Sequence, residues 1–169
     1  MTYLLWLTLG VALSFSIVIF FGAPYVPTLK TQRRQALKML GLKKNQLLVE
    51  LGAGDGIMLV EAGRLGIKAT GYELNPVLVL IGKVRLRQYK DVNIKWSNFW
   101  KADISEADGV YVFLITRFMP KLERKLQSEG KPGLRIVSYT FALPNMEPKK
   151  SMLGLFLYEL PASRQKKSK

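Results

Sequence analysis

A glycine-rich turn at residues 50–56 carries the most specific chemical signal in the sequence. The segment reads ELGAGDG, so an acid precedes glycines at alternate positions, Gly52, Gly54 and Gly56. Glycines permit a sharp turn and let a ligand approach the backbone closely. The dinucleotide fingerprint G-x-G-x-x-G requires a glycine where this chain has Ile57. The spacing therefore favours a ligand with an ammonium group and no pyrophosphate, such as S-adenosylmethionine. The residues that we assign to this cofactor are Glu50, Gly52, Gly54, Asp55 and Gly56.

A second acid, Glu73, ends the next apolar run, in the segment GYELNP at 71–76. A carboxylate at the end of the strand that follows a glycine turn can accept hydrogen bonds from both hydroxyls of an adenosine ribose. Asn75 opens the following helix, with Pro76 at its first position, and we assign it to the same site. The alternatives are a turn with incidental glycines at 50–56 and a solvated charge at Glu73.

The segment SNFW at 97–100 follows a third apolar run and is expected to lie over the adenine. Asn98 could hydrogen-bond the exocyclic amine, and Phe99 or Trp100 could pack on the ring. Trp100 could equally cover the sheet edge. We therefore assign Asn98 and Phe99 to the cofactor site and leave both interpretations of Trp100 open.

The composition restricts the chemistry further. The chain has no cysteine and no histidine, which excludes disulfides, thiolate nucleophiles, histidine-based triads and the common zinc sites. No cluster of acids suggests a carboxylate metal site, so we predict no metal. In-line methyl transfer from a sulfonium needs mainly alignment and desolvation of the reacting groups, which suits this limited set of side chains.

Strands and helices that alternate along the chain must position these residues. Apolar runs predict strands at 46–51, 68–74, 92–97, 109–115, 134–140 and 153–160, and helical patterns predict helices at 29–40, 56–65, 76–89 and 117–127. This alternation predicts an α/β fold, a Rossmann-like, doubly wound, mostly parallel sheet, in a domain spanning residues 23–160.

The first 22 residues form a separate segment without a charged side chain. Residues 3–21 are 19 uncharged residues, enough for a helix of roughly 28 Å, close to the ~30 Å hydrocarbon thickness of a bilayer. We predict a single transmembrane anchor at 1–22; a cleaved signal peptide is the alternative, although the segment lacks a basic start. Basic residues follow closely from Lys30 to Lys38, so the positive-inside rule predicts the catalytic domain on the cytoplasmic face.

All of the net charge of +14 lies after residue 22. Such a charge favours acidic partners, and next to a membrane anchor the anionic membrane surface is the favoured one, with nucleic acid as the second possibility. Residues 161–169 (PASRQKKSK) are predicted to be a basic, disordered tail.

Taken together, these motifs resemble the seven-β-strand S-adenosylmethionine-dependent methyltransferases. Within this class, the chain is similar to the small membrane-anchored lysine methyltransferases related to those that modify the mitochondrial ADP/ATP carrier and the ATP synthase c-subunit. The resemblance covers residues 22 to about 148. The segments that carry it are PYVPT at 24–28, LGAGDG at 51–56, GYELNP at 71–76, NFWK at 98–101, FMPKLERKL at 118–126 and FALP at 141–144.

The resemblance implies a class I methyltransferase fold in which Glu50 and the glycines hold the methionine part of the cofactor and Glu73 holds the ribose. It also implies that residues 24–28 fold over the active site, so that Tyr25 and Thr28 line the cofactor or the entering amine. The alternative is that residues 24–28 are only a linker that leaves the membrane, with its course set by the two prolines. Thr116 and Tyr139 are further candidates for orienting the amine.

Three departures from the family pattern bear on these expectations. Asn98 stands where the family usually has an acid, and residues 114–117 (LITR) replace a Gly-Val-Pro-like turn that borders the substrate pocket. Only one strand is predicted beyond residue 150, so we expect an abbreviated terminal hairpin and a six-stranded sheet.

The predicted function is S-adenosylmethionine-dependent N-methylation of a lysine in a membrane or membrane-proximal protein. The alternatives are a methyltransferase for a lipid, quinone or RNA, and a non-catalytic basic membrane adaptor.

Overall fold

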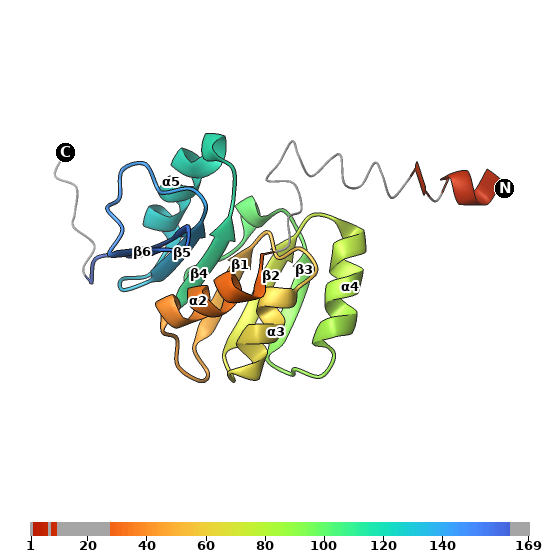
Figure 1. Ribbon diagram of the computed structural model, residues 1–169, viewed down its shortest axis with the longest axis horizontal. Coiled ribbons are helices and arrows are strands. Elements are labelled where there is room, and N and C mark those ends of the chain that lie inside the picture. The colour runs from red at the N-terminus through yellow and green to blue at the C-terminus, as the bar shows by residue number, and fades with distance from the viewer. Residues whose placement is uncertain (1, 7, 10–27, 163–169) are drawn as a thin grey trace.

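The computed structural model describes residues 2–6, 8–9 and 28–162 (Figure 1). Residues 2–6 and 8–9 are helical, and the side chains of Tyr3, Leu4, Leu5 and Trp6 are exposed. Most of the predicted anchor, together with Tyr25 and the end of the basic tail, lies outside the described residues. Within the described residues, no helix has the length and apolar character needed to cross a membrane.

A seven-stranded sheet forms the centre of the domain, with strand order β3-β2-β1-β4-β5-β7-β6. The first five strands pair in parallel, and β7 pairs antiparallel with both β5 and β6. The strands are β1 (Leu47–Leu51), β2 (Lys68–Glu73), β3 (Val92–Trp96), β4 (Gly109–Phe113), β5 (Arg135–Tyr139), β6 (Lys150–Met152) and β7 (Leu155–Glu159). The predicted α/β, mostly parallel sheet is therefore confirmed, and its carboxyl-terminal edge is where ligands bind in such folds.

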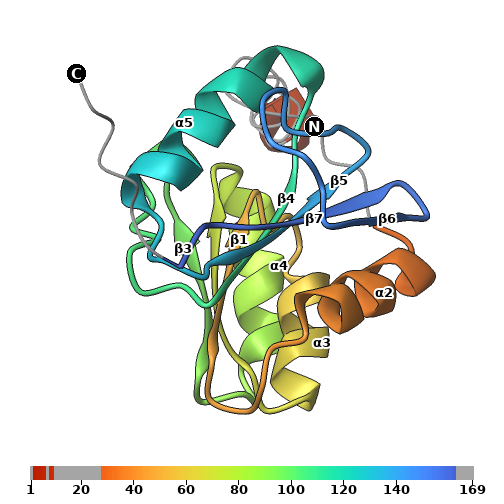
Figure 2. The same ribbon diagram turned by 90° about the vertical axis from the view of Figure 1, so that its left-hand side faces the viewer.

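Helices cover both faces of this sheet (Figure 2). The helices are α2 (Lys30–Leu40), α3 (Ile57–Arg64), α4 (Pro76–Leu86) and α5 (Met119–Glu129), with the short 3-10 turns η1 (Phe99–Lys101) and η2 (Thr116–Phe118). Apolar residues of α2, α3 and α4 form one core cluster, and those of α5 and η1 form a second cluster on the opposite face. Two hydrophobic cores therefore clamp the sheet and fix the position of its strand ends.

The prediction of an abbreviated hairpin and a six-stranded sheet is wrong. A strand at 153–160 was expected; the observed β7 is preceded by β6, and the two pair through a turn at Leu153 and Gly154, both with positive φ. The residues of β6, Lys150–Met152, are all exposed. Their sequence, KSM, shows no apolar alternation that would predict a strand. Pairing with β7 and the tight turn, rather than burial, define this strand.

The loop between β5 and β6 is fastened by three buried polar groups. Ser138 Oγ donates to the carbonyl of Phe141 (2.7 Å), the backbone N–H of Leu143 donates to the hydroxyl of Tyr158 (2.9 Å), and that of Asn145 donates to Glu123 (3.0 Å). These bonds tie the end of β5 to β7 and α5, so the hairpin holds this loop at the carboxyl-terminal edge of the sheet.

Replacing Tyr158 by phenylalanine should lower the free energy of unfolding by about 1–3 kcal/mol, because the buried N–H of Leu143 loses its acceptor. Urea denaturation measures this effect. The matched control is Tyr89→Phe, because no described residue hydrogen-bonds the Tyr89 hydroxyl, and its effect should stay within about 0.5 kcal/mol. Equal effects of the two substitutions would contradict the assigned role of Tyr158.

Candidate active site

Glu50 lies near the end of β1, in the middle of the sheet. Its register partners are Gly71 on β2 and Tyr111 on β4, and only 5% of its surface is exposed. Its Oε2 atom has no hydrogen-bond partner among the described residues. Burial raises the pKa of Glu50 well above its usual value, and the nearby carboxylates of Asp55 and Glu73 raise it further, whereas Arg33 lowers it. A buried carboxylate oxygen without a donor is costly, and a cationic ligand would remove that cost.

The glycine turn leaves open space next to this acid. The N–H groups of Gly52 and Ala53 both donate to the carbonyl of Tyr72 on β2 (2.9 and 3.0 Å), which fixes the turn against the sheet. Gly52 has φ +86° and is exposed, and a Cβ built on it would meet no atom of a described residue within 4 Å. Gly56 directly precedes α3. The predicted glycines thus form a turn at the end of β1 that leaves space at Gly52 among the described residues.

Glu73 connects the glycine turn to the end of β2. Its Oε2 accepts the N–H of Gly54 (2.8 Å), and its Oε1 accepts those of Leu74 (2.9 Å) and Asn75 (2.8 Å). Burial raises the pKa of Glu73, although these three hydrogen bonds act in the opposite direction. Since each carboxylate oxygen can accept about two donors, Oε2 retains capacity for one more. The arrangement accommodates one ribose hydroxyl directly, and a second would require Glu73 to release a backbone bond.

Asn75 and Asp55 have structural partners in this geometry. The Oδ1 atom of Asn75, a fully buried residue, accepts the N–H groups of Val77 (2.9 Å) and Leu78 (3.3 Å) and so caps α4. Asp55 pairs with Arg85 across a 3.0 Å contact. Both residues border the acids of the site, and direct contact with the cofactor remains a prediction for each of them.

The loop predicted to cover the adenine lies beside Glu73, because the N–H of Ser97 donates to the Glu73 carbonyl (2.9 Å). The Oδ1 atom of Asn98 accepts the N–H of Trp100 (3.0 Å) and caps η1. Phe99 is buried within the core of the α5 face, while Trp100 is partly buried and packs against Phe118 at 6.0 Å between ring centroids. The aromatic residues therefore support this loop from the core side.

Thr28, which the family resemblance assigns to the active site, lies beside Tyr111 on β4. Its hydroxyl lies 3.2 Å from the hydroxyl of Tyr111, the β4 residue in register with Glu50. Arg33 of α2 donates to the Thr28 carbonyl and also lies 3.9 Å from Glu61. These contacts hold Thr28, shortly before α2, on the side of the sheet where Tyr111 neighbours Glu50.

Tyr111 and Arg33 are site residues that the sequence analysis missed. The available signal was a tyrosine inside the apolar run GVYVF at 109–113, which parallel register places beside Glu50. Burial raises the pKa of Tyr111, so its hydroxyl stays protonated at neutral pH.

The other two candidates for orienting an amine lie in different places. Tyr139 ends β5 and packs against the same core cluster as Tyr111. Thr116 is exposed at the start of η2, and no contact joins it to Glu50 or Tyr111 in the described part of the chain. Of these two residues, Tyr139 therefore lies in the better position to orient an acceptor amine near Tyr111.

Replacing Glu50 by glutamine should raise the free energy of unfolding at neutral pH. The pKa of Glu50 in the folded protein lies above its unfolded value of about 4.5. The contribution of protonated Glu50 to stability is therefore complete below pH 4.5 and is lost as the pH rises through the folded pKa. The gain of Glu50→Gln over the parent should be near zero at pH 4.5 and grow toward neutral pH in denaturation curves. The exposed control Glu106→Gln should show no such trend, and a flat difference for Glu50→Gln would contradict the buried acid.

Comparison with known proteins places these features in a family. The family model described as the ANTKMT methyltransferase domain matches residues 50–150. A lysine N-methyltransferase of the ATP synthase c-subunit from Xenopus laevis is 36% identical over 128 residues, which cover 74% of this chain and 56% of that protein. A protein-lysine N-methyltransferase of Saccharolobus islandicus is 33% identical over 131 residues, covering 75% of this chain and 81% of that protein.

Among solved structures, an RNA methyltransferase from Salinibacter ruber in complex with S-adenosyl-L-homocysteine has a TM-score of 0.77 and 26% identity, covering 83% of this chain and 97% of that one. The chain spans little more than half the length of the Xenopus relative, 56%. Because the family match includes the glycine turn, Glu73 and strands β2 to β5, this chain belongs to the ANTKMT methyltransferase domain family and has its Rossmann-like methyltransferase fold.

Proposed function

We propose that this chain is an S-adenosylmethionine-dependent methyltransferase that N-methylates a lysine side chain of a membrane or membrane-proximal protein. The observation that carries the proposal is the buried carboxylate of Glu50, whose Oε2 has no donor among the described residues and which lies beside the open backbone of Gly52. Both relatives described above are named as lysine methyltransferases, which supports lysine as the acceptor.

The residues present fit the proposed cofactor. The ammonium of its methionine part would supply the missing donor to Glu50 and favour the ionised form of that acid. The space at Gly52 would accept the same part of the cofactor, and the remaining capacity of Glu73 Oε2 would accept a ribose hydroxyl. The loop at Asn98 would border the adenine, since the adjacent Ser97 is hydrogen-bonded to Glu73.

S-adenosylmethionine, when bound, supplies a methyl group on a positively charged sulfur, which a neutral amine accepts in an in-line displacement. The chain must hold the amine neutral and aligned. The hydroxyls of Tyr111 and Thr28 lie next to Glu50 and can accept hydrogen bonds from an amine. Because burial raises the pKa of Tyr111, this residue orients the amine and does not remove a proton. Tyr25 is proposed to complete this lining.

The proposed membrane substrate follows from the position of Thr28. If residues 1–22 form the anchor, Thr28 is only six positions beyond its end (28 − 22 = 6), and an extended chain of that length spans about 20 Å. The hydroxyl of Thr28 contacts Tyr111 in the site. An acceptor lysine near the membrane surface would therefore be within reach, and the positive-inside rule places the domain on the cytoplasmic face.

RNA is a second candidate acceptor. The Salinibacter ruber neighbour is described as an RNA methyltransferase, and the net charge of +14 suits a polyanion. The cofactor site would be the same, and only the acceptor pocket would differ.

Incubating the full chain with methyl-labelled S-adenosylmethionine and a membrane extract should place the label on protein, specifically on lysine by mass spectrometry. A variant lacking residues 1–22 should bind the cofactor unchanged but leave membrane substrates unlabelled, because the acceptor is no longer held near the site. Label recovered in RNA or lipid would replace the lysine proposal, and full activity of the truncated chain would exclude the role of the anchor.

Replacing Gly52 by alanine should reduce cofactor affinity at least about tenfold, because the new Cβ enters the space proposed for the ligand. The matched control is Gly133→Ala, since Gly133 also has positive φ (+79°) and open space around a Cβ. Both variants should lose about 1–2 kcal/mol of stability from backbone strain. Calorimetric titration with S-adenosylmethionine should separate them, and equal affinities would place the cofactor elsewhere.

A further inference from the structure

The outer face of α4 exposes an apolar stripe that no described element covers. Leu80 and Val84 are 65% and 60% exposed and Ile81 is 38% exposed, so the three lie within about one turn of the helix. The opposite face of the helix is buried against the core through Leu78, Val79, Gly82 and Leu86. Because α4 already buries a complete face, the stripe is a second apolar face with no role in the core.

Trp96 extends this apolar surface onto the edge strand. It ends β3, the outermost strand on this side of the sheet, and its side chain is 67% exposed. Its indole N–H donates to the carbonyl of Leu74 (2.9 Å), just before α4 begins. The polar atom is therefore satisfied by the protein while the ring remains exposed, an arrangement typical of tryptophan at a membrane interface.

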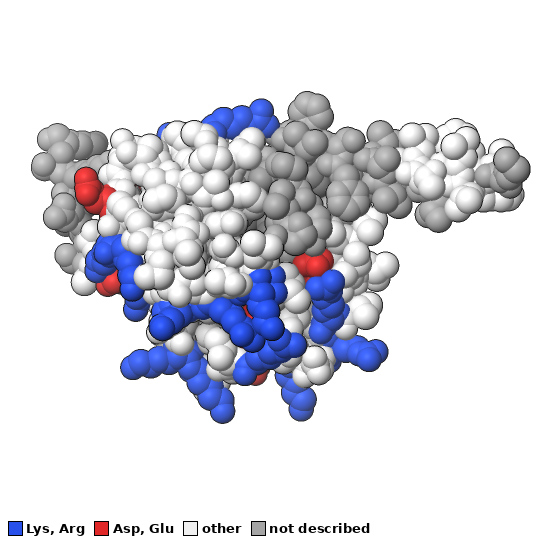
Figure 3. All heavy atoms as spheres, viewed as in Figure 1, with Lys and Arg blue, Asp and Glu red and all other residues white. Residues whose placement is uncertain are grey.

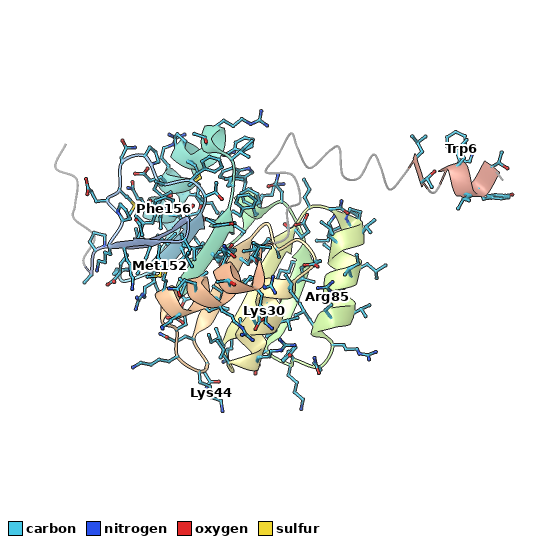
Figure 4. The ribbon with its side chains drawn as sticks, viewed as in Figure 1. Trp6, Lys30, Lys44, Arg85, Met152 and Phe156 are labelled. Atoms are coloured by element: carbon cyan, nitrogen blue, oxygen red, sulfur yellow. The ribbon has the colours of Figure 1, made fainter. Side chains whose placement is uncertain are left out.

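Basic side chains continue the stripe, and no acid interrupts it. Residues 76–90 contain four basic residues and no Asp or Glu. Lys83, Arg85, Arg87 and Lys90 are all exposed, and Arg85 also pairs with Asp55 (Figure 4). Figure 3 shows uncharged surface along the outer side of α4 with basic side chains at its lower end. The helix thus presents apolar and cationic groups side by side.

We propose that this surface, formed by Leu80, Ile81, Val84 and Trp96 with Lys83 and Arg87, docks on an anionic lipid bilayer. Aliphatic side chains can enter the acyl boundary while the neighbouring lysine and arginine reach anionic headgroups, as in helices that lie in the membrane interface. A second copy of the chain is disfavoured, since a two-fold contact would place these cations against their own counterparts.

This inference rests on the proposed membrane association and adds an orientation to it. Because α4 begins directly after Asn75, which lies two residues beyond Glu73, docking would hold the cofactor edge of the sheet close to the lipid surface. The anchor alone would not determine which edge of the domain faces the bilayer. Contact through α4 would fix which edge faces the bilayer, and with it the approach of the acceptor lysine.

The absence of native cysteine allows a direct test in the full chain. Val84→Cys carrying an environment-sensitive fluorophore should be quenched by spin-labelled lipid in phosphatidylcholine vesicles containing about one-third phosphatidylserine. The matched control is Leu65→Cys, because Leu65 is equally apolar and 59% exposed but follows α3, outside the proposed surface. We expect at least about twofold stronger quenching at position 84, reduced by high salt and by Lys83→Glu combined with Arg87→Glu.

Equal quenching at positions 84 and 65, or no association with the vesicles, would overturn the inference. A change of the fluorophore signal at position 84 that occurs without lipid and grows with protein concentration would also overturn the inference. Such a result would indicate a contact between two copies of the chain. Cofactor binding and lysine labelling are measured on the same samples. If position 84 is quenched by lipid but the chain neither binds the cofactor nor labels lysine, only the proposed function is refuted. If the chain binds the cofactor and labels lysine but position 84 is not quenched, only the docking surface is refuted.

Discussion

The burial of Glu50 is the constraint on which the rest of the site depends. A carboxylate in the middle of a parallel sheet, between β2 and β4, is an unfavourable group for folding unless something charged or polar meets it. The described residues leave its Oε2 without a donor, and two further acids lie nearby. The chain therefore retains a destabilising group where a cationic ligand would be recognised, as is common for groups that serve binding.

Glu73 is also a buried carboxylate, but its oxygens are hydrogen-bonded to the backbone. Its three backbone hydrogen bonds join the end of β2, the start of α4 and the glycine turn, so one carboxylate fixes the relative positions of three segments. Glu50 is free to meet a ligand because Glu73 and the Tyr72 carbonyl hold the turn in place. The two acids thus differ in their contacts: Glu73 positions the backbone, whereas the Oε2 atom of Glu50 has no donor among the described residues.

The elements around this site also indicate how the domain could face a membrane. Thr28 enters the site directly from the segment that follows the predicted anchor, and Arg33 holds its carbonyl. Helix α4, which carries the apolar and cationic face, begins at the same edge of the sheet, directly after Asn75, whose N–H is bonded to Glu73. This shared edge links the proposed lipid contact to the approach of an acceptor.

The sequence by itself determined the α/β order, the glycine turn and the two acids, because these depend on local patterns: apolar runs, glycine spacing and strand ends. The tertiary structure decided what depends on pairing between distant segments. Strand register places Tyr111 beside Glu50, folding of the segment before α2 onto the sheet brings Thr28 to Tyr111, and pairing with β7 creates β6 from exposed residues. It also decided that Glu73 accepts the backbone N–H of Gly54, since this bond exists only when the turn and β2 meet. Local sequence patterns encode elements and their ends, whereas contacts between elements arise only when the chain folds.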